Sequence, residues 1–322
     1  MAMLPVPAQP DPSAPAVAPG LVPGPSRSAA HRIGGSRILR AIGSSGKAIA
    51  GTVILAFFTL MAIFPGAIAH DDPHSYGYPR ALGPSPGHIL GTTALGQDIF
   101  AQAVWGARQV VIIAFAVGLL STTIAMVIGV AAAYLGGITD GVLNLITDVL
   151  LVIPLFPLLI LIAGYVHNAG TWVLVLVITA TGWSYTARQL RAQALSIRGR
   201  DFLEAARVRG ERAIYIICVE ILPTMTSLLV ASFLTNALYA VLFSSSLQFI
   251  GLGDLNALSW GTMLYWAQQG AALQIGQYLW AIVPGACILA LGAGFALLNY
   301  AFDEIGNPAL RPVRRLRVKP AR

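Results

Sequence analysis

Residues 201–223 read DFLEAARVRGERAIYIICVEILP and predict a short amphipathic helix that is followed directly by an apolar segment. Small and apolar side chains recur here at alternating spacings of three and four residues, which places them on one face of a helix. These residues are Leu203, Ala206, Gly210, Ala213 and Ile217. A stripe of such slender groups favours close docking on a partner, and it is equally typical of a helix that lies solvated or on a lipid surface.

Charged residues flank this stripe in an order that suits a helix. Asp201 and Glu204 stand in its first turn, where the helix dipole favours acidic groups. Arg207 and Glu211 are four residues apart, so we expect them to pair. The segment is therefore predicted to be a compact charged helix beside a membrane.

Composition predicts that the chain lies in a lipid bilayer. Of its 322 residues, 56% are hydrophobic and 10% are charged, whereas about a quarter of the residues in a soluble domain are charged. Long apolar runs, each able to cross ~30 Å of hydrocarbon as a helix, predict an all-α membrane protein. We expect six transmembrane helices, at residues 48–69, 109–135, 141–165, 171–187, 224–250 and 277–302.

The distribution of Lys and Arg predicts the orientation of these helices. With six spans, eighteen of the 20 basic residues fall on one side, and basic residues favour the cytoplasmic side of short loops. We therefore expect both termini and the loop 188–223 to be cytoplasmic. The formal charge of +7 follows from this asymmetry and indicates an anionic membrane surface rather than nucleic acid. Residues 48–311 form the expected membrane domain, between a disordered Pro-rich tail at 1–47 and a basic tail at 312–322.

Prolines mark two places where the helices should deviate. Pro154 and Pro157 stand near the middle of the expected third span, which should kink or break there and lie beside a polar pathway. Leu222 and Pro223 are expected to end the cytoplasmic loop and to set the entry angle of the fifth span.

A few polar residues lie within the apolar runs. Asp148 in the third span is either a pathway charge or a group that pairs across helices near the inner end. Ser184, Asn236 and Ser245 either line a pathway or hydrogen-bond between helices. On the outer side, the run from His70 to His74 (HDDPH) could be drawn as a metal site. We interpret it as an exposed loop and expect no metal.

The segment 204–223 resembles the EAA motif, EAA-x3-G-x9-I-x-LP, of the membrane subunits of ABC importers, with Glu220 standing where the motif has an apolar residue. Six further matches in order resemble the dipeptide/oligopeptide-type permeases, and specifically their C subunit. The matches are LGTTALGQD (90–98), GAR (106–108), GG-x2-D (136–140), FIGLG (249–253), SWGTML (259–264) and NPALR (307–311). Thr93, Gln97 and Gln102 depart from the family pattern and make the outer face less charged.

The resemblance implies a type I importer permease fold in the bacterial cell membrane, with this chain supplying half of a pore that imports peptides by alternating access. It implies a second homologous permease subunit, two cytoplasmic ATPase subunits that bind ATP and Mg, and an extracytoplasmic substrate-binding protein. The chain itself would be no enzyme and hold no cofactor. The implied contacts with the ATPase are Asp201, Glu204, Ala205, Ala206, Arg207, Gly210, Leu222 and Pro223.

Other interpretations stay open at this stage. The ending NYAFDEIGNPALR is similar to members of the same family that import oligosaccharides. An ion-coupled secondary transporter or channel would tend to carry several charged groups within its spans, whereas the expected spans contain one acid, Asp148. A membrane-anchored scaffold would show no ATPase activity that depends on substrate.

Overall fold

The computed structural model describes residues 46–166 and 170–306 of the chain. The described part is mainly helical and contains only two isolated β-bridges. Most of the tail at 1–47 and all of the tail at 312–322 lie outside the described residues. The elements are α2 (Gly46–Ile63), α3 (Pro65–Ile68), α4 (Ile99–Leu135), α5 (Gly137–Val152), α6 (Leu155–Tyr165), α7 (Thr171–Ile197), α8 (Asp201–Val208), α9 (Ala213–Tyr215), the π-helix η1 (Ile216–Ile221), the 3-10 helix η2 (Leu222–Met225), α10 (Thr226–Phe249), α11 (Trp260–Gln269) and α12 (Tyr278–Gly306).

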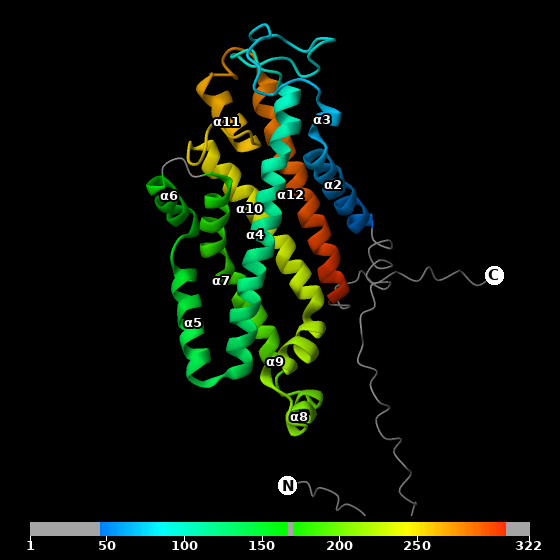
Figure 1. The fold of residues 1–322 in the computed structure, drawn as a ribbon, viewed down its shortest axis with the longest axis vertical. Coiled ribbons are helices and arrows are strands. Elements are labelled where there is room, and N and C mark those ends of the chain that lie inside the picture. The colour runs from blue at the N-terminus through cyan, green and yellow to red at the C-terminus, as the bar shows by residue number, and fades with distance from the viewer. Residues whose placement is uncertain (1–45, 167–169, 307–322) are drawn as a thin grey trace, which may run out of the picture.

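Helix α4 forms the centre of the bundle (Figure 1). It packs along α7 and α10 and also contacts α2, while α12 packs against α10 and α2. The helix is long because no proline or helix-ending glycine interrupts it between the cap at Asp98 and the turn at Gly136. The outer loop between α3 and α4 and the short helix α8 lie at opposite ends of the molecule.

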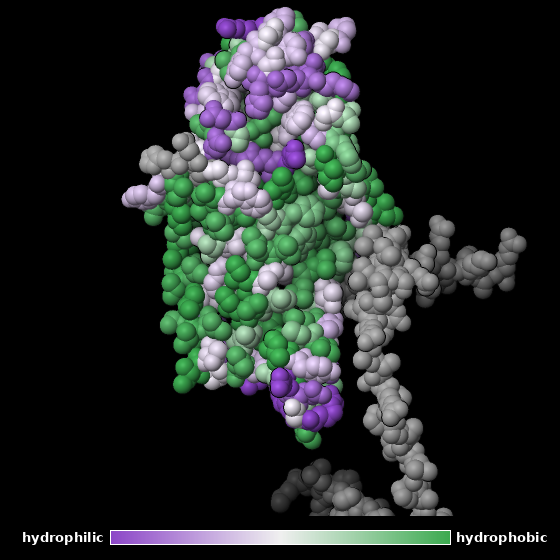
Figure 2. All heavy atoms as spheres, viewed as in Figure 1, coloured by the Kyte–Doolittle hydropathy of each residue, from purple (hydrophilic) through white to green (hydrophobic). Residues whose placement is uncertain are grey.

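The surface of the bundle suits a bilayer. Figure 2 shows an apolar belt along the sides of the helices, with hydrophilic residues gathered at the outer-loop end and around α8. In the described part of the chain, four helical segments are long and apolar enough to cross a membrane, at Gly46–Ile63, Ile99–Leu135, Ala213–Phe249 and Tyr278–Glu304. These match the expected first, second, fifth and sixth spans, so a multi-pass arrangement is supported.

The expected third span does not form a single helix. Helices α5 and α6 meet at an angle of 86°, and this bent pair counts at most as a fifth crossing. The break falls at Ile153 and Pro154, both in extended conformation. Pro154 has no N–H to donate, and its ring excludes helical conformation at the preceding residue, whereas Pro157 sits in the first turn of α6, where a missing donor is harmless. The predicted break near the middle of this span is confirmed.

The expected fourth span, 171–187, is part of a longer helix. Helix α7 continues past residue 187 to Ile197 and carries Arg188 and Arg191 on its last turns. It is not among the segments whose composition alone marks a membrane crossing. The six spans therefore remain a prediction, whereas four segments of the described chain have the length and composition of a membrane crossing.

Candidate functional site

Helix α8 is a separate short helix that protrudes at one end of the bundle (Figure 1). Asp201 and Glu204 lie in its first turn, as expected from the helix dipole. Gly210 ends it with φ of +77°, and the N–H groups of Gly210 and Glu211 donate to the carbonyls of Arg207 (2.9 Å) and Ala206 (3.2 Å). This is a Schellman cap, in which glycine takes the left-handed position without steric cost. Gly210 therefore has a backbone role, independent of any partner.

The two faces of α8 differ from the sequence-based assignment. Leu203 and Ala206 are fully buried in an apolar cluster that includes Ile197 at the end of α7 and Ile216 of η1, the element against which α8 packs. Their stripe is thus used inside the chain, and the prediction that it forms a docking surface is wrong for these two residues. The outward face carries the exposed residues Asp201, Phe202, Glu204, Ala205, Arg207, Val208 and Gly210. Phe202 and Val208 are 40% and 88% exposed, which makes them the apolar groups that this face offers to a partner.

Side chains of α8 and the loop after it make contacts within the chain. Arg207 lies over the ring of Tyr134 with 5.5 Å between its guanidinium carbon and the ring centroid, and it donates to the carbonyl of Arg198 at 3.4 Å. Glu211 pairs instead with Arg209 at 3.7 Å, so the expected pair of Arg207 with Glu211 is not formed. Arg209 also lies 3.6 Å from Glu220, which explains how an acid is accommodated at that position of the motif.

A bidentate ion pair connects the ends of α5 and α7 near this site. Nε and Nη2 of Arg191 donate to the two carboxylate oxygens of Asp140 at 2.6 and 2.7 Å. Both side chains are about three-quarters buried, and two parallel hydrogen bonds fix the planar guanidinium against the carboxylate. The guanidinium of Arg198 lies against the turn at Gly136. Together with Arg207 on Tyr134, these contacts join α8 to the turn between α4 and α5.

The loop expected over 188–223 is shorter in the structure. Helix α7 runs to Ile197, and a helical path resumes at Ala213 and continues to Phe249. Leu222 and Pro223 begin the 3-10 turn inside this path, so the prediction that they end a loop is wrong. At this point the π-helix ends and the 3-10 helix begins. Pro223 therefore stands in the first turn of a helix, where a backbone N–H is not needed for a hydrogen bond within that helix.

Asp148 has a partner on another helix. Arg188 of α7 forms an ion pair with its Oδ1, and Nδ2 of Asn144 donates to its Oδ2 at 2.9 Å. The Asp148 side chain is 43% exposed, so this ion pair lies at the surface of the chain and not in its interior. Of the two interpretations given to Asp148, this geometry matches pairing across helices.

Asn236 joins three helices in the interior. Its Nδ2 donates to Oγ1 of Thr122 on α4 at 3.0 Å, and its Oδ1 accepts from Oγ1 of Thr186 on α7 at 3.1 Å. Ser184 and Ser245 are also buried within the chain, and Oγ of Ser245 has no hydrogen-bond partner among the described residues. In this structure the three predicted polar groups thus lie between the helices of one chain rather than on its outer surface.

Asn236→Leu is expected to destabilise the protein and to leave its preference among substrates unchanged, because Thr122 and Thr186 lose their shared partner. Hydrogen bonds between membrane helices are worth about 0.6–1.7 kcal/mol, so we expect a loss of this size for each of the two bonds. Thermal unfolding of the purified protein in detergent measures the effect. A changed substrate preference at unchanged stability would contradict the packing role and favour a pathway role.

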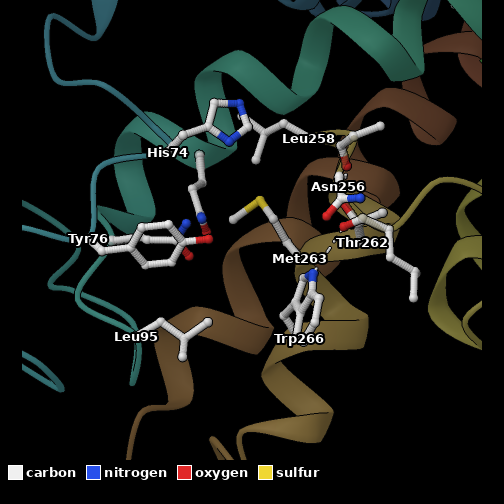
Figure 3. Close-up of a pocket in the computed structure, with 12 residues that line it drawn as sticks. His74, Tyr76, Leu95, Asn256, Leu258, Thr262, Met263 and Trp266 are labelled. Atoms are coloured by element: carbon white, nitrogen blue, oxygen red, sulfur yellow. Dashed lines mark hydrogen bonds between the residues drawn. The ribbon is translucent and has the colours of Figure 1, made fainter.

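A cavity lies at the outer end, between the outer loop and α11 (Figure 3). Its volume is about 180 Å³, and its lining includes His74, Gln97 and Gln102 on one side and Asn256, Met263 and Trp266 on the other. This cavity could not be predicted from the sequence, because one wall comes from residues 74–102 and the other from residues 255–266. Its lining also includes the apolar side chains of Leu95, Leu255 and Leu258, so the cavity is mixed in character.

The bundle of long apolar helices and the apolar belt around it define a multi-pass membrane protein, with the short helix α8 protruding at one end. Residues 125–305 match the family described as binding-protein-dependent transport system inner membrane component, and the chain belongs to this family.

The chain is similar to named permeases along most of its length. It is 32% identical over 271 residues to the oligopeptide transport system permease protein OppC of Mycobacterium tuberculosis (strain ATCC 25618 / H37Rv), covering 81% of this chain and 92% of that protein. It is 28% identical over 262 residues to the dipeptide transport system permease protein DppC of Bacillus subtilis (strain 168), covering 81% and 79%. It is 27% identical over 279 residues to the probable D,D-dipeptide transport system permease protein DdpC of Escherichia coli (strain K12), covering 86% and 92%.

Proposed function

We propose that this chain is a membrane subunit of an ATP-driven importer of peptides. The observation that carries the proposal is the similarity, over most of the chain, to three permeases that are named for oligopeptides or dipeptides. In this proposal the chain forms half of the translocation path together with a second homologous permease. Two ATPase subunits bind ATP and Mg on the cytoplasmic side, and a binding protein delivers the peptide from outside.

The proposed arrangement assigns α8 to the ATPase side. Its outward face combines two exposed apolar groups, Phe202 and Val208, with the acids Asp201 and Glu204, which suits a partner groove with an apolar floor and basic rim. Arg207 connects this helix to Tyr134 at the end of α4 and to the carbonyl of Arg198 after α7. Nearby, the ion pair of Asp140 with Arg191 joins α5 to α7. The proposal includes six crossings and cytoplasmic termini, which place the outer cavity on the side of the binding protein.

Reconstitution of the complete transporter tests the proposal. We expect a peptide-loaded binding protein to stimulate ATP hydrolysis and to drive uptake of labelled peptide into proteoliposomes that hold this chain with its partner permease and ATPase subunits. Stimulation by an oligosaccharide-loaded binding protein alone would overturn the peptide assignment. Uptake that depends on an ion gradient and not on ATP would overturn the transporter class.

A further inference from the structure

The outer loop brings together three potential metal ligands that are distant in the sequence. One ligand atom each of Asp71, His88 and Asp98 lies within 4.8 Å of the other two. The closest two atoms are Nδ1 of His88 and Oδ2 of Asp98, at 2.7 Å. This set shares only Asp71 with the run from His70 to His74, which we interpreted as an exposed loop. In that run, Asp72 accepts a hydrogen bond from the backbone N–H of His74 at 2.9 Å.

The loop holds two of these side chains in fixed positions. Asp98 is the N-cap of α4, where its Oδ1 accepts from the N–H of Ala101 at 2.7 Å and its Oδ2 remains directed at His88. Isolated backbone bridges join Ser85 to His88 and Thr92 to Asp98. The side chains of His88 and Asp98 are only 12% and 3% exposed. An ion bound here would therefore meet two ligands that are already oriented, with exposed Asp71 completing the set from the solvent side.

The charge around these ligands favours a cation. Tyr78 donates to Oδ1 of Asp71 at 3.0 Å, and its ring lies edge-on to the His88 ring with 4.5 Å between centroids. Asp71 and Asp98 bring two carboxylates to the set. Arg80 of the same loop is exposed and pairs with none of these acids among the described residues.

The kind of ligand selects the metal. We propose that Asp71, His88 and Asp98 bind one zinc ion on the outer face of the protein. Imidazole nitrogen and carboxylate oxygen are ligands that Zn²⁺ accepts, whereas Ca²⁺ and Mg²⁺ prefer shells made of oxygen. Ligand atoms around tetrahedral zinc stand roughly 3.3 Å apart, so the ion replaces the proton between His88 and Asp98 and the two side chains separate slightly. Water fills the fourth position.

Zinc at this place would tie three points of the chain together. Asp71 follows α3, His88 lies within the outer loop, and Asp98 begins α4. The ion would fix the loop that also forms one wall of the outer cavity, through His74 and Gln97. Binding by the chain itself does not depend on the cargo, so this inference and the proposed function can fail separately.

Metal titration of the full-length protein in lipid nanodiscs tests the inference. After treatment with a chelator, we expect the protein to take up about one equivalent of Zn²⁺, to give a tetrahedral Co²⁺ spectrum, and to retain zinc in excess Mg²⁺ or Ca²⁺. His88→Gln and Asp71→Asn should each weaken zinc binding about tenfold or more. Both variants keep a group able to make the existing hydrogen bond, which protects the fold. Protection of the outer loop against proteolysis should rise when zinc is added to the wild type.

His74→Gln and Asp72→Asn are the matched controls, because they change the same residue types in the same loop outside the set. We expect them to bind zinc as the wild type does. A wild-type protein that takes up no zinc, or that gives an octahedral Co²⁺ spectrum, would overturn the inference and leave a His–Asp pair that shares a proton. An equal loss of zinc in the control variants would overturn the assignment of ligands.

Discussion

Ala205→Trp is expected to reduce peptide import at least about tenfold while the permease remains folded. Ala205 lies on the exposed face of α8, between Phe202 and Val208, and its side chain contributes nothing to the interior. An indole at this position would prevent close approach of the helix to a partner, because packing at the core of an interface is as dense as in a protein interior. ATP hydrolysis stimulated by the loaded binding protein, and uptake into proteoliposomes, measure the effect.

Ala206→Trp is the matched comparison, one residue further along the same helix. Ala206 is fully buried in the apolar cluster that it shares with η1, so the larger side chain overfills that cluster and is expected to destabilise the permease by about 1–3 kcal/mol or more. Thermal unfolding separates the two variants, since Ala205→Trp should leave the unfolding temperature unchanged. Normal coupling in Ala205→Trp would remove the docking role from this face of α8.

This pair shows what the sequence could and could not predict for α8. The acids in the first turn, the spacing of Leu203 and Ala206 and the glycine at the end correctly predict a short helix with one apolar face. The pattern cannot say whether that face packs on the same chain or on a partner, because both surfaces select small apolar groups. Only the positions of α4 and α7 decide the question, and they depend on contacts between residues far apart in the sequence.

For the membrane helices too, the sequence predicts some features and not others. Apolar runs correctly predict the segments at 48–69, 109–135, 224–250 and 277–302, since a long uncharged run has few alternatives to a spanning helix. Prolines predict the position of the break between α5 and α6. The angle of 86° is set by the packing of α6 against α7 and α10, which the sequence does not display.

Polar residues were the hardest to interpret from the sequence. Asp148 was recognised as a membrane acid, but its partner Arg188 lies forty residues away on another helix. Trp260 is fully buried and donates from Nε1 to the carbonyl of Ala103 at 2.8 Å, although tryptophan is also common at lipid interfaces. Tryptophan occurs both in buried cores and at lipid interfaces, so the residue type alone does not distinguish the two places. The neighbouring helices decide where this side chain lies.

Helices α4 and α7 are in close contact at Gly129. A Cβ atom at Gly129 would lie 2.5 Å from the carbonyl oxygen of Ala187 and 3.2 Å from the backbone nitrogen of Arg191. The two helix backbones are therefore in direct contact, as small residues allow in membrane bundles. The same contact positions Arg191 for its ion pair with Asp140.

Gly129→Leu is accordingly expected to prevent the accumulation of folded permease, because the backbone of α7 cannot yield in the way that a flexible side chain can. We expect a destabilisation of at least about 3 kcal/mol, at the upper end for overpacked sites. Gly182→Leu is the matched control within α7, since a Cβ there meets nothing within 4 Å. Leucine at this control site also favours helix over glycine by about 0.5–1 kcal/mol, so its unfolding temperature should hold or rise. Membrane yield and thermal unfolding measure both variants, and equal behaviour of the two would contradict the close backbone contact that orients Arg191 toward Asp140.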